Sequence, residues 1–262
     1  MKPITTITLT AFGGAILITL AAICVAKAQT PNSPVQDSYF EPTSENLEHV
    51  PAGLATVEPT HFPDAPGKIK HVHEGDNLTR IVGQNVTFRD LMAEAYACSP
   101  GHVMLPANAP KGRYDFVVTI SPQTRKHLRT TIETKLGYAA TVETLPAEVL
   151  VLQVKDPSTP GLTVSTASDD DINFHDGQLY FTRQPLSVVT RGLEEGLGRP
   201  VLDQTGLTNN YDFTVPWTTN SMQAMQAGAF HLDGVQKFMN GWGLDLTTTT
   251  TNVELCVVQK VR

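Results

Sequence analysis

The chain lacks the short motifs by which many enzymes are identified from sequence. It has neither the His-Glu-x-x-His motif of zinc peptidases nor the Gly-x-Ser-x-Gly elbow of serine hydrolases. Gly192, Gly196 and Gly198 precede a strand pattern instead of opening a helix, which is the reverse of what a dinucleotide site requires. We therefore predict no catalytic residues, although the sequence leaves enzymatic activity open.

Basic residues are also scarce. There are 19 Lys and Arg residues against 26 Asp and Glu residues, and the net charge is −7. Removal of the first 28 residues, which include Lys2 and Lys27, makes the net charge −9. An acidic surface does not attract nucleic acid or an anionic membrane, so we predict neither as a partner. The partner that we expect is therefore an unknown ligand or a protein of the cell envelope.

The N-terminus has the pattern of an export signal. Residues 4–25 are almost all apolar or small, and Ala26-Lys27-Ala28 offers the small-x-small site that a signal peptidase reads. We predict a signal peptide over residues 1–28 and a mature protein in the periplasm or outside the cell. The segment is also long enough to stay uncleaved as a membrane anchor.

Cysteine is rare, with three in the whole chain. Only Cys98 and Cys256 remain after cleavage of the signal peptide. Export permits a disulfide between them. Cys256 lies in a continuous apolar strand pattern, which is typical of a buried free thiol, and both alternatives stay open.

The rest of the chain divides by composition. Residues 29–66 are rich in proline and have little hydrophobic periodicity, which predicts an extended N-terminal segment. Regular patterns then predict a first module over 67–156 and a second over 174–262. Residues 157–173, rich in proline, serine and aspartate, are the predicted linker.

One motif occurs twice. Tyr114-Asp-Phe116 recurs as Tyr211-Asp-Phe213, and in both halves a helix pattern ending at a glycine follows, Gly137 or Gly243. We predict an α+β fold of two tandem duplicated modules, each a small antiparallel or mixed sheet with two helices. Each module is expected to end in a hairpin of its own.

These residues also carry a family resemblance. The run GRPVLDQTGLTNNYDFTVPW (198–217), with 242–246 and 254–258, resembles the C-terminal signature of an uncharacterised secreted family of soil bacteria, chiefly acidobacteria. Residues 86–96 resemble its N-terminal signature. The resemblance covers about 53–262 and implies location and fold but no activity. Some relatives are fused to membrane metallopeptidase sensors, which implies binding or sensing. Each half is also similar to the short N-terminal modules of secretins and TonB-dependent receptors.

The candidate ligand-binding residues are Trp217, Trp242, Tyr211 and Asp203. The two tryptophans are the only ones in the chain, and they would form an aromatic wall for a peptide or glycan near the Met-rich insert 216–230. Packing in the core is the alternative. Asp203 opens a sequence similar to the phosphorylation motif of P-type ATPases but without its lysine, and a turn stabilised by the Asp203 carboxylate is the other interpretation.

His71 and His73 are the candidate metal ligands. Residues i and i+2 of a strand share a face, so both imidazoles would reach one Zn²⁺ or Cu²⁺ ion. A third ligand must come from elsewhere in the chain, and two solvated histidines are the alternative. No other cofactor is predicted. The adjacent Glu194 and Glu195 are predicted to lie on the surface of a helix.

Together these patterns favour an exported binding or sensing module without enzymatic activity. A metal-dependent hydrolase using His71 and His73, and a structural component of the cell envelope, are the alternatives.

Overall fold

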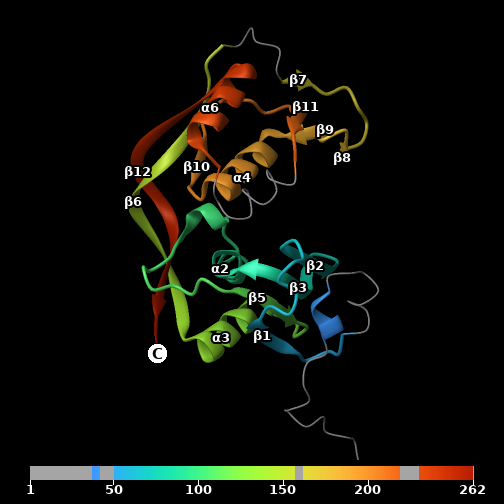
Figure 1. The fold of residues 1–262 in the computed structure, drawn as a ribbon, viewed down its shortest axis with the longest axis vertical. Coiled ribbons are helices and arrows are strands. Elements are labelled where there is room, and N and C mark those ends of the chain that lie inside the picture. The colour runs from blue at the N-terminus through green and yellow to red at the C-terminus, as the bar shows by residue number, and fades with distance from the viewer. Residues whose placement is uncertain (1–36, 42–49, 157–161, 219–229, 262) are drawn as a thin grey trace, which may run out of the picture. The chain divides into compact units, whose positions relative to one another are not determined.

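The computed structural model describes residues 37–41, 50–156, 162–218 and 230–261 (Figure 1). The predicted signal peptide lies outside these ranges, as does most of the Met-rich insert. The described residues belong to one compact unit. Within the described residues, no helix is long and apolar enough to cross a membrane.

The first sheet is antiparallel and has the strand order β1-β5-β3-β2. Its strands are β1 (Ala55–Pro59), β2 (Lys68–Glu74), β3 (Asn77–Thr87) and β5 (Arg113–Val118), with the short 3-10 helix η1 (Asp37–Phe40) nearby. Helices α2 (Phe88–Tyr96) and α3 (Thr124–Leu136) pack against this sheet.

Local sequence signals explain where these two helices begin and end. The Thr87 hydroxyl accepts a hydrogen bond from the Asp90 amide, and the Asp90 carboxylate accepts from the Thr87 amide, so a capping box starts α2. Helix α3 ends at Gly137, which adopts a left-handed conformation with φ of 75°. The sequence pattern predicted the glycine that ends α3.

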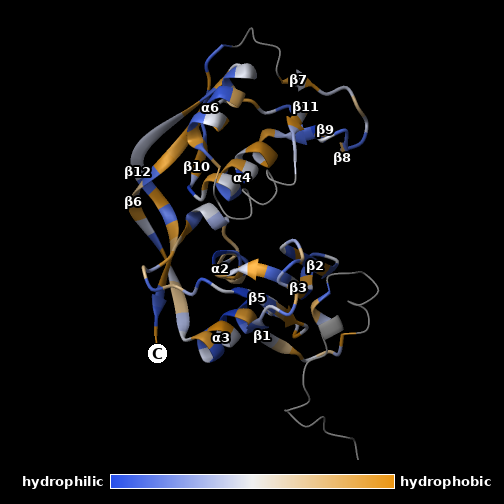
Figure 2. Cartoon of the chain, in the orientation of Figure 1, coloured by the Kyte–Doolittle hydropathy of each residue, from blue (hydrophilic) through white to orange (hydrophobic). Residues whose placement is uncertain are grey.

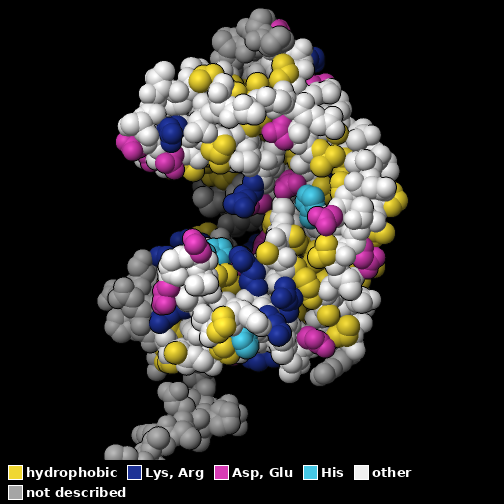
Figure 3. Space-filling view, turned by 180° about the vertical axis from the view of Figure 1, so that it is seen from behind, with side chains coloured by type: hydrophobic (Ala, Val, Ile, Leu, Met, Phe, Trp, Pro, Cys, Tyr) yellow, Lys and Arg dark blue, Asp and Glu magenta, His cyan; other side chains and the backbone are white. Residues whose placement is uncertain are grey.

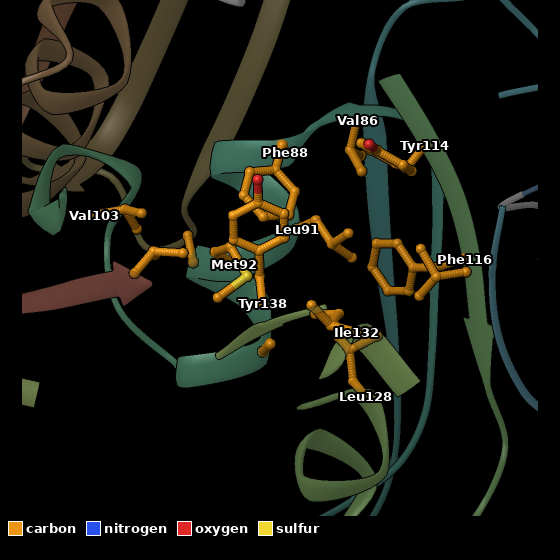
Figure 4. Close-up of a cluster of buried hydrophobic side chains, with 14 of the residues drawn as sticks. Val86, Phe88, Leu91, Met92, Val103, Tyr114, Phe116, Leu128, Ile132 and Tyr138 are labelled. Carbon is orange, nitrogen blue, oxygen red and sulfur yellow. The ribbon is translucent and has the colours of Figure 1, made fainter. Parts of the chain in front are cut away.

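The first hydrophobic core lies between this sheet and its helices (Figure 4). Phe116 from β5, Leu91 from α2 and Leu128 from α3 are each fully buried in it. Tyr138, which follows α3, packs edge-on against Phe88 with ring centroids 5.1 Å apart. Burying side chains of this size removes about 1.5–3 kcal/mol of unfavourable hydration each, which makes this cluster the main stabilising element of the region.

The second sheet is antiparallel and has the order β7-β11-β9-β8. Its strands are β7 (Thr163–Val164), β8 (Asp171–His175), β9 (Gln178–Pro185) and β11 (Asn210–Pro216). Helices α4 (Leu186–Leu197) and α6 (Leu232–Gly241) contribute Leu193 and Met239 to a second hydrophobic core with Phe213.

A third sheet, with the order β10-β6-β12-β4, contains strands from both halves of the chain. Its strands are β4 (Val103–Met104), β6 (Tyr138–Val154), β10 (Val201–Asp203) and β12 (Leu244–Lys260), and η2 (Pro100–His102) directly precedes β4. The strands β6 and β12 have 17 residues each and are antiparallel over their whole length, from Leu244 opposite Val154 to Lys260 opposite Tyr138.

The mixed α and β content is confirmed, but the prediction of two duplicated modules, each with its own small sheet and two helices, is wrong. The described residues form three sheets, and the last strand of each half pairs with the last strand of the other. The hairpin expected at the end of each half is absent from the described residues, because 138–154 and 244–260 are continuous strands.

The sequence explains why no turn forms there. Residues 247–251 are all threonine, whose branched side chain favours a strand. Pro146, opposite Asn252, is tolerated because β10 pairs with β6 only at Leu150–Leu152, so the proline nitrogen faces no strand partner. Figure 2 shows hydrophobic residues interspersed with hydrophilic ones along both strands.

The two Tyr-Asp-Phe motifs do have similar local settings. Asp115 accepts a hydrogen bond from the Asn85 amide at 2.7 Å, and Asp212 accepts one from the Arg183 amide at 2.8 Å. Asn85 and Arg183 have φ of 49° and 55°, and each lies at a register shift three residues before a helix. The similarity therefore concerns a bulged strand end and does not extend to separate modules.

Candidate functional site

A cleft of about 1040 Å³ is lined by residues of β2, α2, α3 and α4 and by the loops before β4 and β5. Its lining holds more positive than negative charge. Six cationic side chains line it: Lys68, Arg89, Lys111, Arg113, Arg125 and Arg191. The three carboxylates in the lining are Asp90, Glu94 and Glu195. Figure 3 shows Lys and Arg side chains gathered beside a hollow on the face that it draws.

Three of the cations are held by the protein itself. Arg89 donates from Nη1 to the Val103 carbonyl at 2.6 Å and to the Pro100 carbonyl at 3.1 Å. Arg113 donates from Nη1 to the Asn85 carbonyl at 2.6 Å. These bonds use one nitrogen of each guanidinium, which has five N–H groups in all. The guanidinium groups are therefore fixed in place with donors to spare.

Arg125 and His71 share one carboxylate. Arg125 Nε lies 3.0 Å from Glu94 Oε1, and His71 Nε2 lies 2.9 Å from Glu94 Oε2. Glu94 is thus paired with one guanidinium and hydrogen-bonded to an imidazole, and its charge opposes an incoming anion less than that of an unpaired carboxylate.

The other three cations, Lys68, Lys111 and Arg191, have exposed side chains. They come from β2, from the loop before β5 and from α4. Burial raises the pKa of Glu195, which lies beside them, and nearby Asp90 and Glu194 raise it further, whereas Arg191 opposes the shift. Protonation of Glu195 therefore makes the cleft more positive at a higher pH than for an ordinary glutamate.

Beside the cleft, His102 connects η2 to α4. Its Nδ1 lies 2.8 Å from the Glu254 carbonyl oxygen and its Nε2 lies 3.1 Å from Glu194 Oε1. The bond to Glu194, and then that to Glu254, raises the pKa of His102 against the opposing effect of burial. Burial alone would raise the pKa of Glu194, but its hydrogen bonds, first that from His102, outweigh burial and lower it.

Cys98, His102 and Glu194 are the residue types of a thiol-protease triad, but their geometry does not serve that chemistry. The two ring nitrogens of His102 are directed at the Glu254 carbonyl oxygen and at the Glu194 carboxylate, so neither faces the Cys98 thiol. A general base must lie within hydrogen-bond reach of the thiol that it deprotonates. The Cys98 thiol instead contacts Cys256; their hydrogen bond lowers the pKa of Cys98, and both cysteines are free.

The predicted aromatic residues lie away from the cleft lining. Tyr211 is buried in the second core. Trp242 packs against Phe238 and Phe213, with ring centroids 4.7 and 5.2 Å away. Trp217 is half-buried and donates its backbone amide to the Gly177 carbonyl at 2.7 Å. The structure does not bring the two tryptophans together in this cleft.

Asp203 forms the turn that was one of its two interpretations. Its Oδ1 accepts hydrogen bonds from the Thr205 amide at 2.9 Å and from the Thr205 hydroxyl at 2.6 Å. This is the local pattern by which aspartate stabilises a turn.

Of the two predicted metal ligands, His71 lines the cleft. The ring centroids of His71 and His73 are 6.2 Å apart, and a register shift follows Val72. The described part of the chain contains no cluster of three His, Cys, Asp or Glu side chains able to hold a metal.

Sequence reasoning missed the cations of the cleft and the role of Glu194. The cations are spread from residue 68 to residue 191, so no local motif connects them. Glu194, expected on the surface, is 8% exposed, because the η2 loop covers it. Gly101 is the sequence feature that could have indicated this contact. A Cβ at Gly101 would lie 2.7 Å from the Arg199 carbonyl oxygen, so only glycine permits the η2 loop to approach the end of α4 so closely.

The chain belongs to the family described as "Protein of unknown function (DUF3738)", which matches residues 89–261. The match covers both Tyr-Asp-Phe motifs, α2 to α6 and most of the residues that line the cleft. No curated protein and no solved structure matches the chain.

Proposed function

We propose that the protein is an exported binding module and that the cleft binds an anionic ligand. One observation carries the proposal: six cationic side chains from separate parts of the chain line one cleft in a protein whose net charge is −7. In an acidic protein, such a local excess of positive charge concentrates anions in the cleft.

The chemistry of the lining supports a carboxylate or phosphate group on the ligand. Arg89 and Arg113 are positioned by bonds to backbone carbonyls, and a fixed guanidinium binds such groups with two parallel hydrogen bonds. The cleft volume of about 1040 Å³ is at the upper end of the range for sites that take metabolite-sized molecules.

The proposal also includes the cellular location of the protein and the kind of organism from which it comes. The N-terminal pattern supports export to the periplasm or the exterior, by cleavage after residue 28 or with the segment kept as an anchor. The run 198–217 supports a soil-bacterial member of the family, and the similarity to secretin and TonB-receptor modules favours a place in the cell envelope.

The test is thermal unfolding of the purified protein with pyrophosphate or citrate as probes, at an ionic strength matched with sodium chloride. At a probe concentration of about 100 times Kd, binding adds about 2.7 kcal/mol of stability, which raises Tm by about 5 °C. The triple variant Lys68→Ala, Lys111→Ala, Arg191→Ala should lose this shift, because it removes the three exposed cations without touching the bonds of Arg89 and Arg113.

Lys237→Ala is the matched control, because Lys237 is an exposed cation on α6 outside the cleft. It should keep the full shift. Equal shifts in the triple variant and in the wild type would show that the probes bind elsewhere, and the absence of any shift with either probe would remove the proposal.

A metal-dependent hydrolase using His71 and His73 is the alternative. It rests on the 6.2 Å separation of the two rings and on the nearby Glu94. If Zn²⁺ or Cu²⁺ raises Tm and EDTA reverses the rise in wild type but not in His71→Ala, the metal alternative is supported.

A further inference from the structure

Among the described residues, the β8 edge of the second sheet has no neighbouring strand and presents large apolar side chains to solvent. β8 is the last strand in the order β7-β11-β9-β8, and all five of its residues are exposed. Ile172 is 51% and Phe174 is 60% exposed. Soluble proteins usually protect such an edge with charge, proline or a covering segment, because an unpaired strand accepts another strand.

The hairpin geometry shows which backbone groups of β8 face outward. Asp176 and Gly177 both have positive φ and join β8 to β9 as a two-residue turn, so His175 and Gln178 form the hydrogen-bonded pair that closes it. By alternation, the N–H and C=O groups of Ile172 and Phe174 point away from β9. The Ile172 amide accordingly donates to the Asp171 carboxylate, at 2.8 Å, and not to β9.

The sequence of β8, Asp-Ile-Asn-Phe-His, complements itself in one antiparallel register. With Asn173 opposite Asn173 of a second copy, Ile172 lies opposite Phe174 and Asp171 lies opposite His175. The outward backbone groups then meet, and each Ile172–Phe174 pair exchanges two hydrogen bonds. The alternating pleat places the apolar pairs on one face and the Asp–His pairs on the other.

We propose that two copies of this chain pair through β8 in this register and form one continuous sheet. The apolar side chains of the two strands cover one another on one face. On the other face, the Asp171 carboxylate releases the Ile172 amide and accepts a hydrogen bond from His175 of the second copy. His175 is held for this by stacking on Tyr180, with ring centroids 3.9 Å apart.

The interface is small, since it is centred on a strand of five residues, so the dimer is reversible. We expect sedimentation velocity of the purified protein to show a dimer fraction that grows between about 10 μM and about 1 mM.

Phe174→Lys should be monomeric over that whole range, because it places an ammonium group against Ile172 of the second copy. The control is Val142→Lys, a change of the same kind on β6 at a side chain that is 59% exposed, and it should dimerise like the wild type. Both substituted side chains point into solvent, so both variants should fold, and unchanged unfolding curves verify this.

A charge exchange tests the register. Asp171→His and His175→Asp should each weaken the dimer at least tenfold, since each places two like groups opposite one another, and the double variant should recover it. A wild type that stays monomeric at about 1 mM, a Phe174→Lys variant that dimerises like wild type, or a double variant as weak as the single ones overturns the proposal.

Discussion

Asp115 and Asp212 stand in the same local structure, where each accepts the amide hydrogen of a residue with positive φ three positions before a helix. Their surroundings differ. Asp115 is fully buried and also accepts hydrogen bonds from the Thr60 hydroxyl at 2.8 Å and the His61 amide at 2.6 Å. Asp212 is half-buried, and a hydroxyl, that of Ser165, is its other partner.

The difference comes from the segment that follows β1. In the first region, Thr60 and His61 cover Asp115 from the side opposite the bulge. In the second region β7, a strand of two residues, takes that place and leaves Asp212 in contact with water. The same three-residue motif thus accompanies the bulge in both regions. Residues distant in sequence determine how deeply its aspartate is buried, and therefore how much the aspartate contributes to the free energy of unfolding.

Replacing Asp115 should have the largest effect. Asp115→Ala leaves the buried amide of Asn85 without an acceptor and also removes the hydrogen bonds from the Thr60 hydroxyl and the His61 amide, which together costs about 4 kcal/mol of unfolding free energy. Urea unfolding measures it. Asp212→Ala should cost clearly less, because water replaces the carboxylate. Equal losses at the two sites would refute the comparison.

The two regions also differ at the residue that pairs with the phenylalanine of the motif on the neighbouring strand, which is Gly83 in the first region and Phe181 in the second. A Cβ on Gly83 would lie 2.0 Å from the Phe116 ring, so Gly83→Ala should cost about 3 kcal/mol by overpacking. In the second region Phe181 occupies that position and stacks on Phe213 with centroids 4.6 Å apart. Phe181→Ala should instead cost about 2 kcal/mol by leaving a gap. Thermal unfolding of both variants measures the two losses of stability.

His102 joins the two regions through Glu194, and the pH dependence of stability should reveal it. A histidine whose folded pKa is raised above its ordinary value of 6.5 contributes stability that is complete below 6.5 and is lost as pH rises through the raised value. We expect His102→Gln to cost about 2 kcal/mol at about pH 6 and to flatten the decline that the wild type shows toward pH 9. A variant curve parallel to that of the wild type would contradict the assignment.

The smallest effect should come from removing one partner of Asp115. Thr60→Val preserves shape but removes the hydroxyl that donates to Asp115 at 2.8 Å and accepts from the Phe62 amide at 3.1 Å, at a cost of about 1 kcal/mol. The same loss in the Asp115→Ala background would mean that Thr60 acts independently of Asp115, which the structure does not predict; a double-mutant cycle measures this coupling.

Local signals predicted the local structure. The capping box of α2, the glycine that ends α3 and the turn at Asp203 are each specified by neighbouring residues. The glycine was predicted, and the turn was one of the two interpretations of Asp203. Pairing between distant strands could not be obtained in this way. Because β6 and β12 have the composition of strands throughout, nothing in either sequence states that each pairs with the other half of the chain.

The candidate site was unpredictable for the same reason. Predictions centred on rare residues such as Trp217 and on spaced pairs such as His71 and His73. The cleft instead depends on ordinary arginines and lysines of β2, α2, α3 and α4, and the fold alone brings them together. Glu194 follows this rule, since its burial requires contact with the η2 loop.

The most direct test of the proposed function is an NMR titration of the ¹⁵N-labelled protein with pyrophosphate at constant ionic strength. The account predicts saturable shifts at the amides of Lys68, Lys111, Arg113 and Arg191, with residues of β8 and α6 unchanged. Shifts that are linear in pyrophosphate concentration, or that centre outside the cleft, would contradict an anion-binding site there.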